Sequence, residues 1–203
     1  MPKIVNHEKM RSEIARKAIA LLAKKGFQAT TIQDIANAAG VGKGTIYHYF
    51  RTKEEILLVV SNELFYEMER SFGAALLRID DPLDKMAALI EEAMHVNEDV
   101  ENIFIVYTEL WLINVHSHKY QDFVGVIKKM HHDLTALVSN MIDAGKNRGR
   151  WDRDTDSQAL ACYLVSSFDG VIAHYMIDKE KIDIKKVTKE FIRFLLQRGA
   201  PRK

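Results

Sequence analysis

Residues 31–50 read TIQDIANAAGVGKGTIYHYF, and their pattern predicts two short helices joined by a tight turn. Apolar side chains recur with the i, i+3, i+4, i+7 spacing that puts them on one helix face. They are Ile32, Ile35, Ala36 and Ala39. Thr31 with Asp34 three residues later resembles a capping box, in which two side chains satisfy the first free amides of a helix. Gly40 is the expected end of this helix, and a second short helix is expected from Lys43 to Phe50.

The turn between these helices is Ala39-Gly40-Val41-Gly42, in which Ala39 and Gly40 are the small residues that allow two helices to cross closely. If Ile46 and Phe50 point inward, the outward face of the second helix carries Lys43, Gly44, Thr45, Tyr47 and His48. A major groove about 12 Å wide admits one such helix, whose N-terminal residues reach the base edges. The segment is therefore predicted to be a helix-turn-helix that binds double-stranded DNA.

Charge is distributed unevenly along the chain. Residues 1–53 carry ten basic and three acidic side chains, a net charge of +7, whereas the remainder carries −6. A compact basic module favours a polyanionic partner. A solvated basic helix face is the alternative interpretation, and charge alone does not decide between them.

The stretch from Thr31 to Leu57 strongly resembles the DNA-binding signature of the TetR family of bacterial transcriptional regulators. The similarity covers roughly residues 8–60, and the rest of the chain matches that family only in its helix layout. One position departs from the family pattern: Gly42 stands where the family most often has a serine that caps the recognition helix, so we expect only a backbone contribution there.

The resemblance implies a role for each matching residue. Lys43, Thr45 and Gly44 are expected to face bases. The expected contacts to the sugar-phosphate backbone come from Thr31, Gln33, Tyr47, His48 and Lys53. A second similarity, of residues 40–45 to a nucleotide-binding phosphate loop, is weak, because such a loop needs a glycine where the chain has Asn37 and a strand before it.

Composition excludes several classes of protein. Ten glycines and three prolines in 203 residues are too few for an all-β fold, and one cysteine excludes an internal disulfide and a cysteine-ligated metal cluster. No apolar run approaches the ~18 residues that cross a membrane, and the N-terminus has no apolar signal segment. We therefore expect a cytoplasmic protein with no membrane partner. Cys162 is expected to be a buried small side chain.

Helical periodicity continues to the C-terminus and predicts an all-α fold of about nine helices. Residues 1–52 are predicted to form the helix-turn-helix DNA-binding domain, and residues 53–203 a helical effector-binding and dimerisation domain. Beyond the capping box at 52–55, the expected helices are 53–79, 82–97, 103–115, 120–145, one from Asp154 or Asp156 to residue 177, and one from Asp183 to Gly199.

The larger domain is rich in methionine and aromatic side chains, which suit an adaptable apolar cavity. The predicted effector pocket comprises Phe65, Met68, Phe72, Met94, Phe104, Tyr107, Trp111 and Phe168. Glu109 and Asn114 share the most apolar helix with Tyr107 and Trp111, where a polar group needs a hydrogen bond or a ligand.

The last two helices are apolar over more than one face, which predicts a two-fold dimer interface. Its predicted residues are Leu160, Leu164, Phe168, Val171, Phe191 and Phe194. His116 and His118 with Asp122 form the strongest metal candidate, but a solvated helix end is favoured, so we expect no metal and no cofactor. No catalytic constellation is present in the sequence, which indicates a protein that is not an enzyme.

These observations favour a ligand-responsive, homodimeric repressor that a hydrophobic or amphipathic small molecule releases from a palindromic operator. A helical small-molecule carrier and a nucleotide-binding enzyme are the alternatives.

Overall fold

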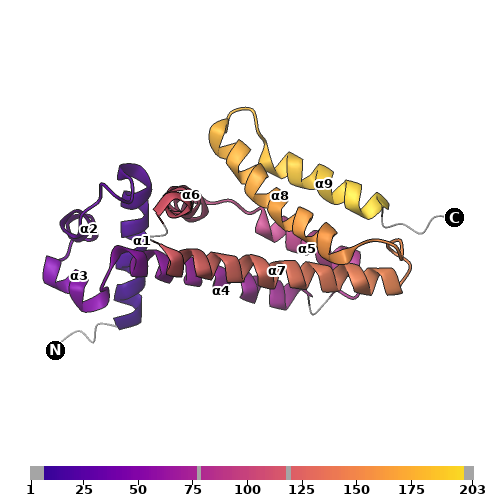
Figure 1. Cartoon of the computed structure of the whole chain (residues 1–203), viewed down its shortest axis with the longest axis horizontal. Coiled ribbons are helices and arrows are strands. Elements are labelled where there is room, and N and C mark those ends of the chain that lie inside the picture. The colour runs from indigo at the N-terminus through magenta and orange to yellow at the C-terminus, as the bar shows by residue number, and fades with distance from the viewer. Residues whose placement is uncertain (1–6, 77–78, 118–119, 199–203) are drawn as a thin grey trace. The chain divides into compact units, whose positions relative to one another are not determined.

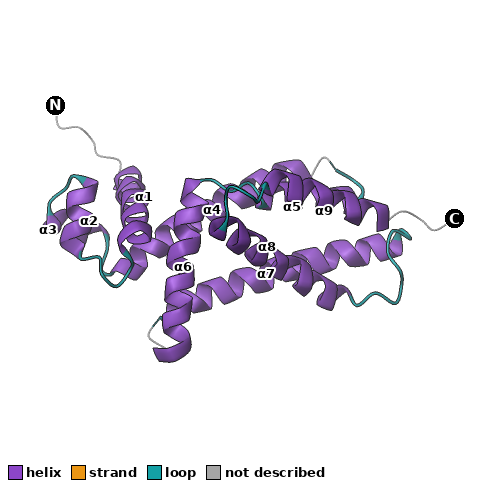
Figure 2. Ribbon diagram, turned by 90° about the horizontal axis from the view of Figure 1, so that it is seen from above, coloured by secondary structure: helices purple, strands orange, loops and turns teal. Residues whose placement is uncertain are grey.

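The computed structural model of the chain describes residues 7–76, 79–117 and 120–198, which form nine helices and no strand (Figures 1 and 2). The predicted all-α fold is therefore confirmed. The helices are α1 His7–Lys25, α2 Ile32–Ala39, α3 Lys43–Tyr49, α4 Lys53–Leu76, α5 Pro82–Ala93, α6 Glu98–Ser117, α7 Gln121–Asn147, α8 Ser157–Ile177 and α9 Ile184–Arg198.

The chain divides into two compact units. The first unit contains residues 1–66 and 97–125, and the second contains residues 67–96 and 126–203. Helix α6 thus belongs with the N-terminal helices although it follows α5 in sequence. The predicted division into a DNA-binding domain of residues 1–52 and an effector-binding domain of residues 53–203 stays a prediction.

The core of the first unit explains why its short helices are stable. α1 buries one face, which consists of Ile14, Ala15, Ala18, Ile19 and Leu22. α2 contributes Ile35 and Ala36, and α3 contributes Ile46, each fully buried. Burial of a side chain the size of Ile or Leu stabilises the fold by ~1.5–3 kcal/mol. Helices of seven or eight residues are marginal alone, so this packing holds them in place.

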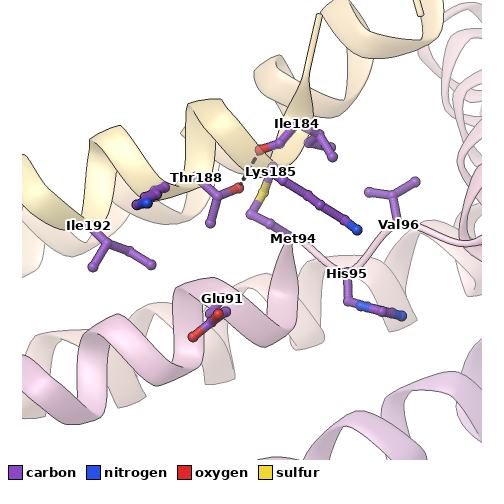
Figure 3. A pocket seen from close by; sticks show the side chains of 9 residues that line it. Glu91, Met94, His95, Val96, Ile184, Lys185, Thr188 and Ile192 are labelled. Atoms are coloured by element: carbon purple, nitrogen blue, oxygen red, sulfur yellow. Dashed lines mark hydrogen bonds between the residues drawn. The ribbon is translucent and has the colours of Figure 1, made fainter.

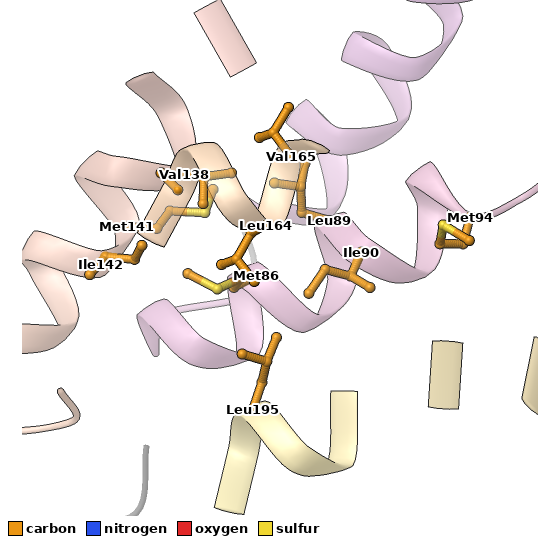
Figure 4. Close-up of a cluster of buried hydrophobic side chains, with 11 residues drawn as sticks. Met86, Leu89, Ile90, Met94, Val138, Met141, Ile142, Leu164, Val165 and Leu195 are labelled. Carbon is orange, nitrogen blue, oxygen red and sulfur yellow. The ribbon is translucent and has the colours of Figure 1, made fainter. Parts of the chain in front are cut away.

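The second unit has its own core, to which α5, α7, α8 and α9 all contribute (Figure 4). The core includes Met86, Leu89, Ile90, Val138, Ile142, Leu164, Val165 and Leu195. α5 starts as predicted, since the Asp81 carboxylate accepts hydrogen bonds from the amides of Leu83 and Asp84, and Pro82 occupies the first helical position.

Four local expectations need correction. α5 ends at Ala93 rather than at residue 97, because the amides of His95 and Val96 donate to the carbonyls of Glu92 and Met94 and do not continue the helical pattern. α6 begins at Glu98 rather than at residue 103, because the Asn97 side chain accepts a hydrogen bond from the Val100 amide and starts the helix in a polar stretch. α7 continues past Gly145 to Asn147; it is Gly149, at φ 69°, that lies in the left-handed region where helices end. Cys162 is exposed, because it lies on a face of α8 that the unit's own core does not cover.

Among the described residues, α8 alone is long and apolar enough to cross a membrane by length and composition, with a mean hydropathy of 1.4. Only 22% of the 18-residue stretch of α8 that has this hydropathy is buried. A helix that packs in a protein interface meets the same two criteria, so this finding by itself does not indicate a membrane span.

Candidate nucleic-acid interface

The start of α2 is a complete capping box. The Asp34 amide donates to Thr31 Oγ1 at 3.1 Å, and Asp34 Oδ2 accepts from the Thr31 amide at 2.8 Å. Asp34 Oδ2 also accepts from Lys25 Nζ at 2.6 Å, and this bond, followed by those from Thr31, holds the pKa of the Asp34 carboxyl well below its usual range. The predicted cap is confirmed, and it fixes where α2 starts.

The turn between α2 and α3 depends on Gly40. Its φ of 72° lies in the left-handed region, which favours glycine because other side chains are strained there. The Gly40 amide donates to the carbonyls of Ala36 and Asn37, and the Val41 amide donates to the Ala36 carbonyl at 3.0 Å. These bonds close the end of α2 and redirect the chain into α3.

α3 presents one face to the core and the other to solvent. Ile46 and the following Phe50 are buried, whereas Lys43, Gly44, Tyr47 and His48 are exposed and Thr45 is half-buried. Gly42 caps the helix with no side-chain hydrogen bond, as its lack of a side chain requires. Lys43 Nζ lies 6.0 Å from the centre of the Tyr47 ring, so a cation and an aromatic ring share the outward face.

α1 and α4 hold this helix pair from behind. The Arg11 guanidinium donates to Glu55 Oε1 at 2.7 Å and lies 5.3 Å from the centre of the Phe50 ring. Glu55 Oε2 also accepts from the Arg51 amide at 2.8 Å. Lys17 Nζ donates to the Ala39 carbonyl, the last residue of α2. The outward face of α3 therefore rests on a rigid support.

Lys53 has a structural role that the sequence did not indicate. Its ammonium group donates to the carbonyls of Phe27 at 2.6 Å and Thr30 at 2.8 Å, and lies 4.6 Å from the centre of the Phe27 ring. The predicted phosphate contact requires the ammonium group to share or give up these carbonyls. That contact stays a prediction.

α6 is tied to the same loop between α1 and α2. The Glu109 carboxylate accepts hydrogen bonds from the amides of Phe27 at 2.8 Å and Gln28 at 3.3 Å. Nearer the start of α6, Asp99 pairs with Arg16 of α1 at 2.9 Å. Asn114 likewise accepts from the Tyr120 amide, so Asp99, Glu109 and Asn114 of this apolar helix each have a protein partner. The apolar surroundings of Glu109 gave a signal that it needed a partner, but not which one.

The chain is similar to known bacterial transcriptional regulators. A family model described as bacterial regulatory proteins, tetR family, matches residues 14–60. The HTH-type transcriptional regulator BetI of Brucella canis is 32% identical over 145 residues, which cover 70% of this chain and 72% of that protein. The chain belongs to the TetR family. The HTH-type transcriptional regulator PksA of Bacillus subtilis is 23% identical over 197 residues, covering 95% of this chain and 92% of PksA.

Solved structures of TetR-family regulators share the fold. The fatty acid degradation regulator FadR from Bacillus halodurans superposes with a TM-score of 0.79 at 21% identity, covering 98% of this chain and all of that one. A regulator from Saccharomonospora viridis in complex with choline gives 0.77 at 21% identity, covering 93% and 96%. FadR from Bacillus subtilis in complex with stearoyl-CoA gives 0.75 at 20% identity, covering 91% and 96%.

Membership of the TetR family decides between the functional classes. The chain is a DNA-binding transcriptional regulator and not an enzyme. The nucleotide-binding interpretation of residues 40–45 is wrong, because α2 rather than a strand precedes them and Lys43 begins a helix.

The predicted effector residues are distributed over both units. Phe104, Tyr107 and Trp111 lie on α6 in the first unit, and Trp111 is 48% exposed. Met94 and Phe168 belong to the second unit, where Met94 is buried and Phe168 packs against the same core. The side chains of Phe65, Met68 and Phe72 lie outside the described residues. A shared cavity stays a prediction.

The predicted dimer residues differ in how far they are buried in their own subunit. Leu164 is only 4% exposed and belongs to the core of its own subunit, so it is not available for an interface. Phe194 is 53% exposed. Partly buried side chains packed against the core are those of Leu160, Phe168, Val171 and Phe191. Sequence reasoning missed the most exposed apolar side chains of α8, those of Tyr163 and Ile177.

The histidine candidate for a metal site is incomplete here, since His118 and the Asp122 side chain lie outside the described residues. Within the described part of the chain, no three His, Cys, Asp or Glu side chains gather as a metal would require.

Proposed function

We propose that this regulator is a homodimeric repressor that reads a palindromic operator through α3 and leaves it when a small molecule binds the C-terminal helices. The observation that carries the proposal is the two-sided character of α3. Ile46 and Phe50 are only 0% and 1% exposed. Lys43, Tyr47 and His48 face solvent on the opposite side of the helix. Regulators of this kind act on DNA in the cytoplasm.

In the proposed complex, Lys43, Gly44 and Thr45 at the N-terminal end of α3 reach the base edges of the major groove. Tyr47 and His48, one turn further along, contact the sugar-phosphate backbone, as do Thr31, Gln33 and Lys53. Base contacts supply sequence preference, whereas phosphate contacts supply affinity that falls as salt rises.

A second copy of the chain is the proposed partner of α8 and α9. Tyr163 and Ile177 of α8 are 71% and 82% exposed, and Val187 and Phe194 of α9 are 40% and 53% exposed. Four large apolar side chains exposed on these two helices favour a protein interface that covers them. Two-fold pairing also provides two recognition helices, which must lie about 34–36 Å apart to read two half-sites.

An effector releases the operator if it binds more tightly to a dimer whose recognition helices are spaced too far apart or too close together for DNA. A modest difference in free energy is sufficient. α4 extends from residue 53, next to the helix-turn-helix, to residue 76, and its 24 residues span about 36 Å at ~1.5 Å each. A tilt of about 0.1 radian would move one end by about 4 Å. A coupling free energy of ~1–3 kcal/mol lowers operator affinity roughly 5- to 150-fold. The stearoyl-CoA bound by one structural neighbour, an acyl chain with a polar head, supports an amphipathic effector.

Selection from random duplexes, followed by gel shift, tests the operator proposal. The protein should enrich a palindrome with half-site centres about one helical turn apart. Lys43→Ala and Thr45→Ala should change which bases are preferred, each costing ~1–3 kcal/mol at the affected position. A carrier would enrich no sequence, and equal losses on the selected and a random duplex would remove both residues from base reading.

A further inference from the structure

A groove of about 780 Å³ lies within the second unit, between the end of α5 and the first half of α9 (Figure 3). Its apolar lining includes Met94, Ile184 and Ile192. Of the residues predicted for the effector pocket, Met94 lines this groove. A volume of this size is within the range of small-molecule sites.

The charged lining of the groove is predominantly positive. Lys185 and Lys189 are four residues apart, so they lie on the same face of α9. Figure 3 shows Lys185 extending from α9 toward the loop that carries His95 and Val96. Glu91 of α5 is the acidic residue of the lining.

Neither lysine is neutralised by the described part of the chain. Lys185, Lys189 and Glu91 make no side-chain hydrogen bond or ion pair with described residues, although all three are exposed at the groove. α9 as a whole carries five basic residues and one acidic residue. Like charges at i and i+4 on a helix repel each other, and an anion placed between them removes that repulsion.

We propose that this groove binds a small amphipathic anion. Its carboxylate or phosphate group lies between Lys185 and Lys189, and its apolar chain covers Met94, Ile184 and Ile192. Lysine binds either anionic group as a point charge, so the groove selects charge and an apolar chain rather than one head group. The inference rests on the proposed function only where this ligand is taken to be the effector.

Titration calorimetry on the full-length protein tests the binding step, with decanoate, decyl phosphate and neutral 1-decanol as probes of equal chain length, below their aggregation limits. At least one anion should bind, and about tenfold more tightly than the alcohol. The variant with both Lys185→Gln and Lys189→Gln should lose about tenfold in anion affinity and little in alcohol affinity. Glu91→Gln should bind the anion more tightly, a gain that a merely structural role would not produce.

Lys186→Gln is the matched control, because Lys186 is an exposed neighbour on α9 that does not line this groove. Its anion affinity should stay within about twofold of the unaltered protein. The proposal is overturned if neither anion binds, or if the double lysine variant binds as tightly as the control. If the anion binds in the groove but leaves the operator complex intact in a gel shift, the groove assignment stands and its identification with the effector site fails.

Discussion

Lys53 is a side chain that can contribute both to the stability of the fold and to DNA binding. Its ammonium group holds the Phe27 and Thr30 carbonyls, so Lys53→Ala should lower the free energy of unfolding by ~1–3 kcal/mol, the usual loss for hydrogen bonds to a charged group. Thermal denaturation measures this loss. If Lys53 also contacts phosphate, the same variant should reduce the salt slope of DNA binding by about one. Lys43→Ala is the control for stability, since Lys43 is exposed and donates no hydrogen bond to described residues. An unchanged melting temperature for Lys53→Ala would contradict the structural role.

At the scale of an element, α6 acts as a clamp on the loop that leads into α2. The Glu109 carboxylate accepts from the Phe27 and Gln28 amides, and the chain from there reaches the Thr31 cap within three residues. Glu109→Ala should therefore speed hydrogen exchange at these two amides and weaken binding to every duplex about tenfold, because the helix pair is less preorganised. Glu98→Ala provides the control on the same helix, at an exposed position that makes no hydrogen bond to the Phe27 and Gln28 amides. Full protection of both amides in Glu109→Ala would count against the clamp.

At the scale of the whole molecule, the exposed apolar side chains of α8 predict the oligomeric state. The variant with both Tyr163→Glu and Ile177→Glu should be a monomer of 23.3 kDa by light scattering, whereas the unaltered protein should have twice that mass. Charges on the paired faces repel and lose hydration on association. Loss of the second half-site contact should weaken palindrome binding by about a hundredfold or more. Tyr66→Glu on α4, at a residue 67% exposed, is the control. A dimeric double variant would place the interface elsewhere.

The helix-turn-helix could be predicted closely because its signals are local. The Thr31 and Asp34 cap and the Gly40 turn depend on neighbours within four residues, and both are present as expected. The local helix period also predicted that Ile46 lies on the inward face of α3, although its burial comes from packing. The start of α6 was missed, because a polar first turn capped by Asn97 does not show apolar periodicity. The exposure of Cys162 was also missed, because a helix that is apolar on several faces does not reveal which face the core covers.

Periodicity, caps and turn residues determined by themselves which segments are helical, where α2 and α5 begin and which face of α3 is apolar. These properties arise from interactions between residues a few positions apart, which the order of amino acids specifies directly. Only the tertiary structure decided that Lys53 binds the carbonyl of Phe27, that Glu109 binds its amide and that Leu164 is buried in the core of its own subunit. The Glu109 bond joins residues 82 positions apart, and such a pairing depends on how whole helices pack rather than on any local pattern.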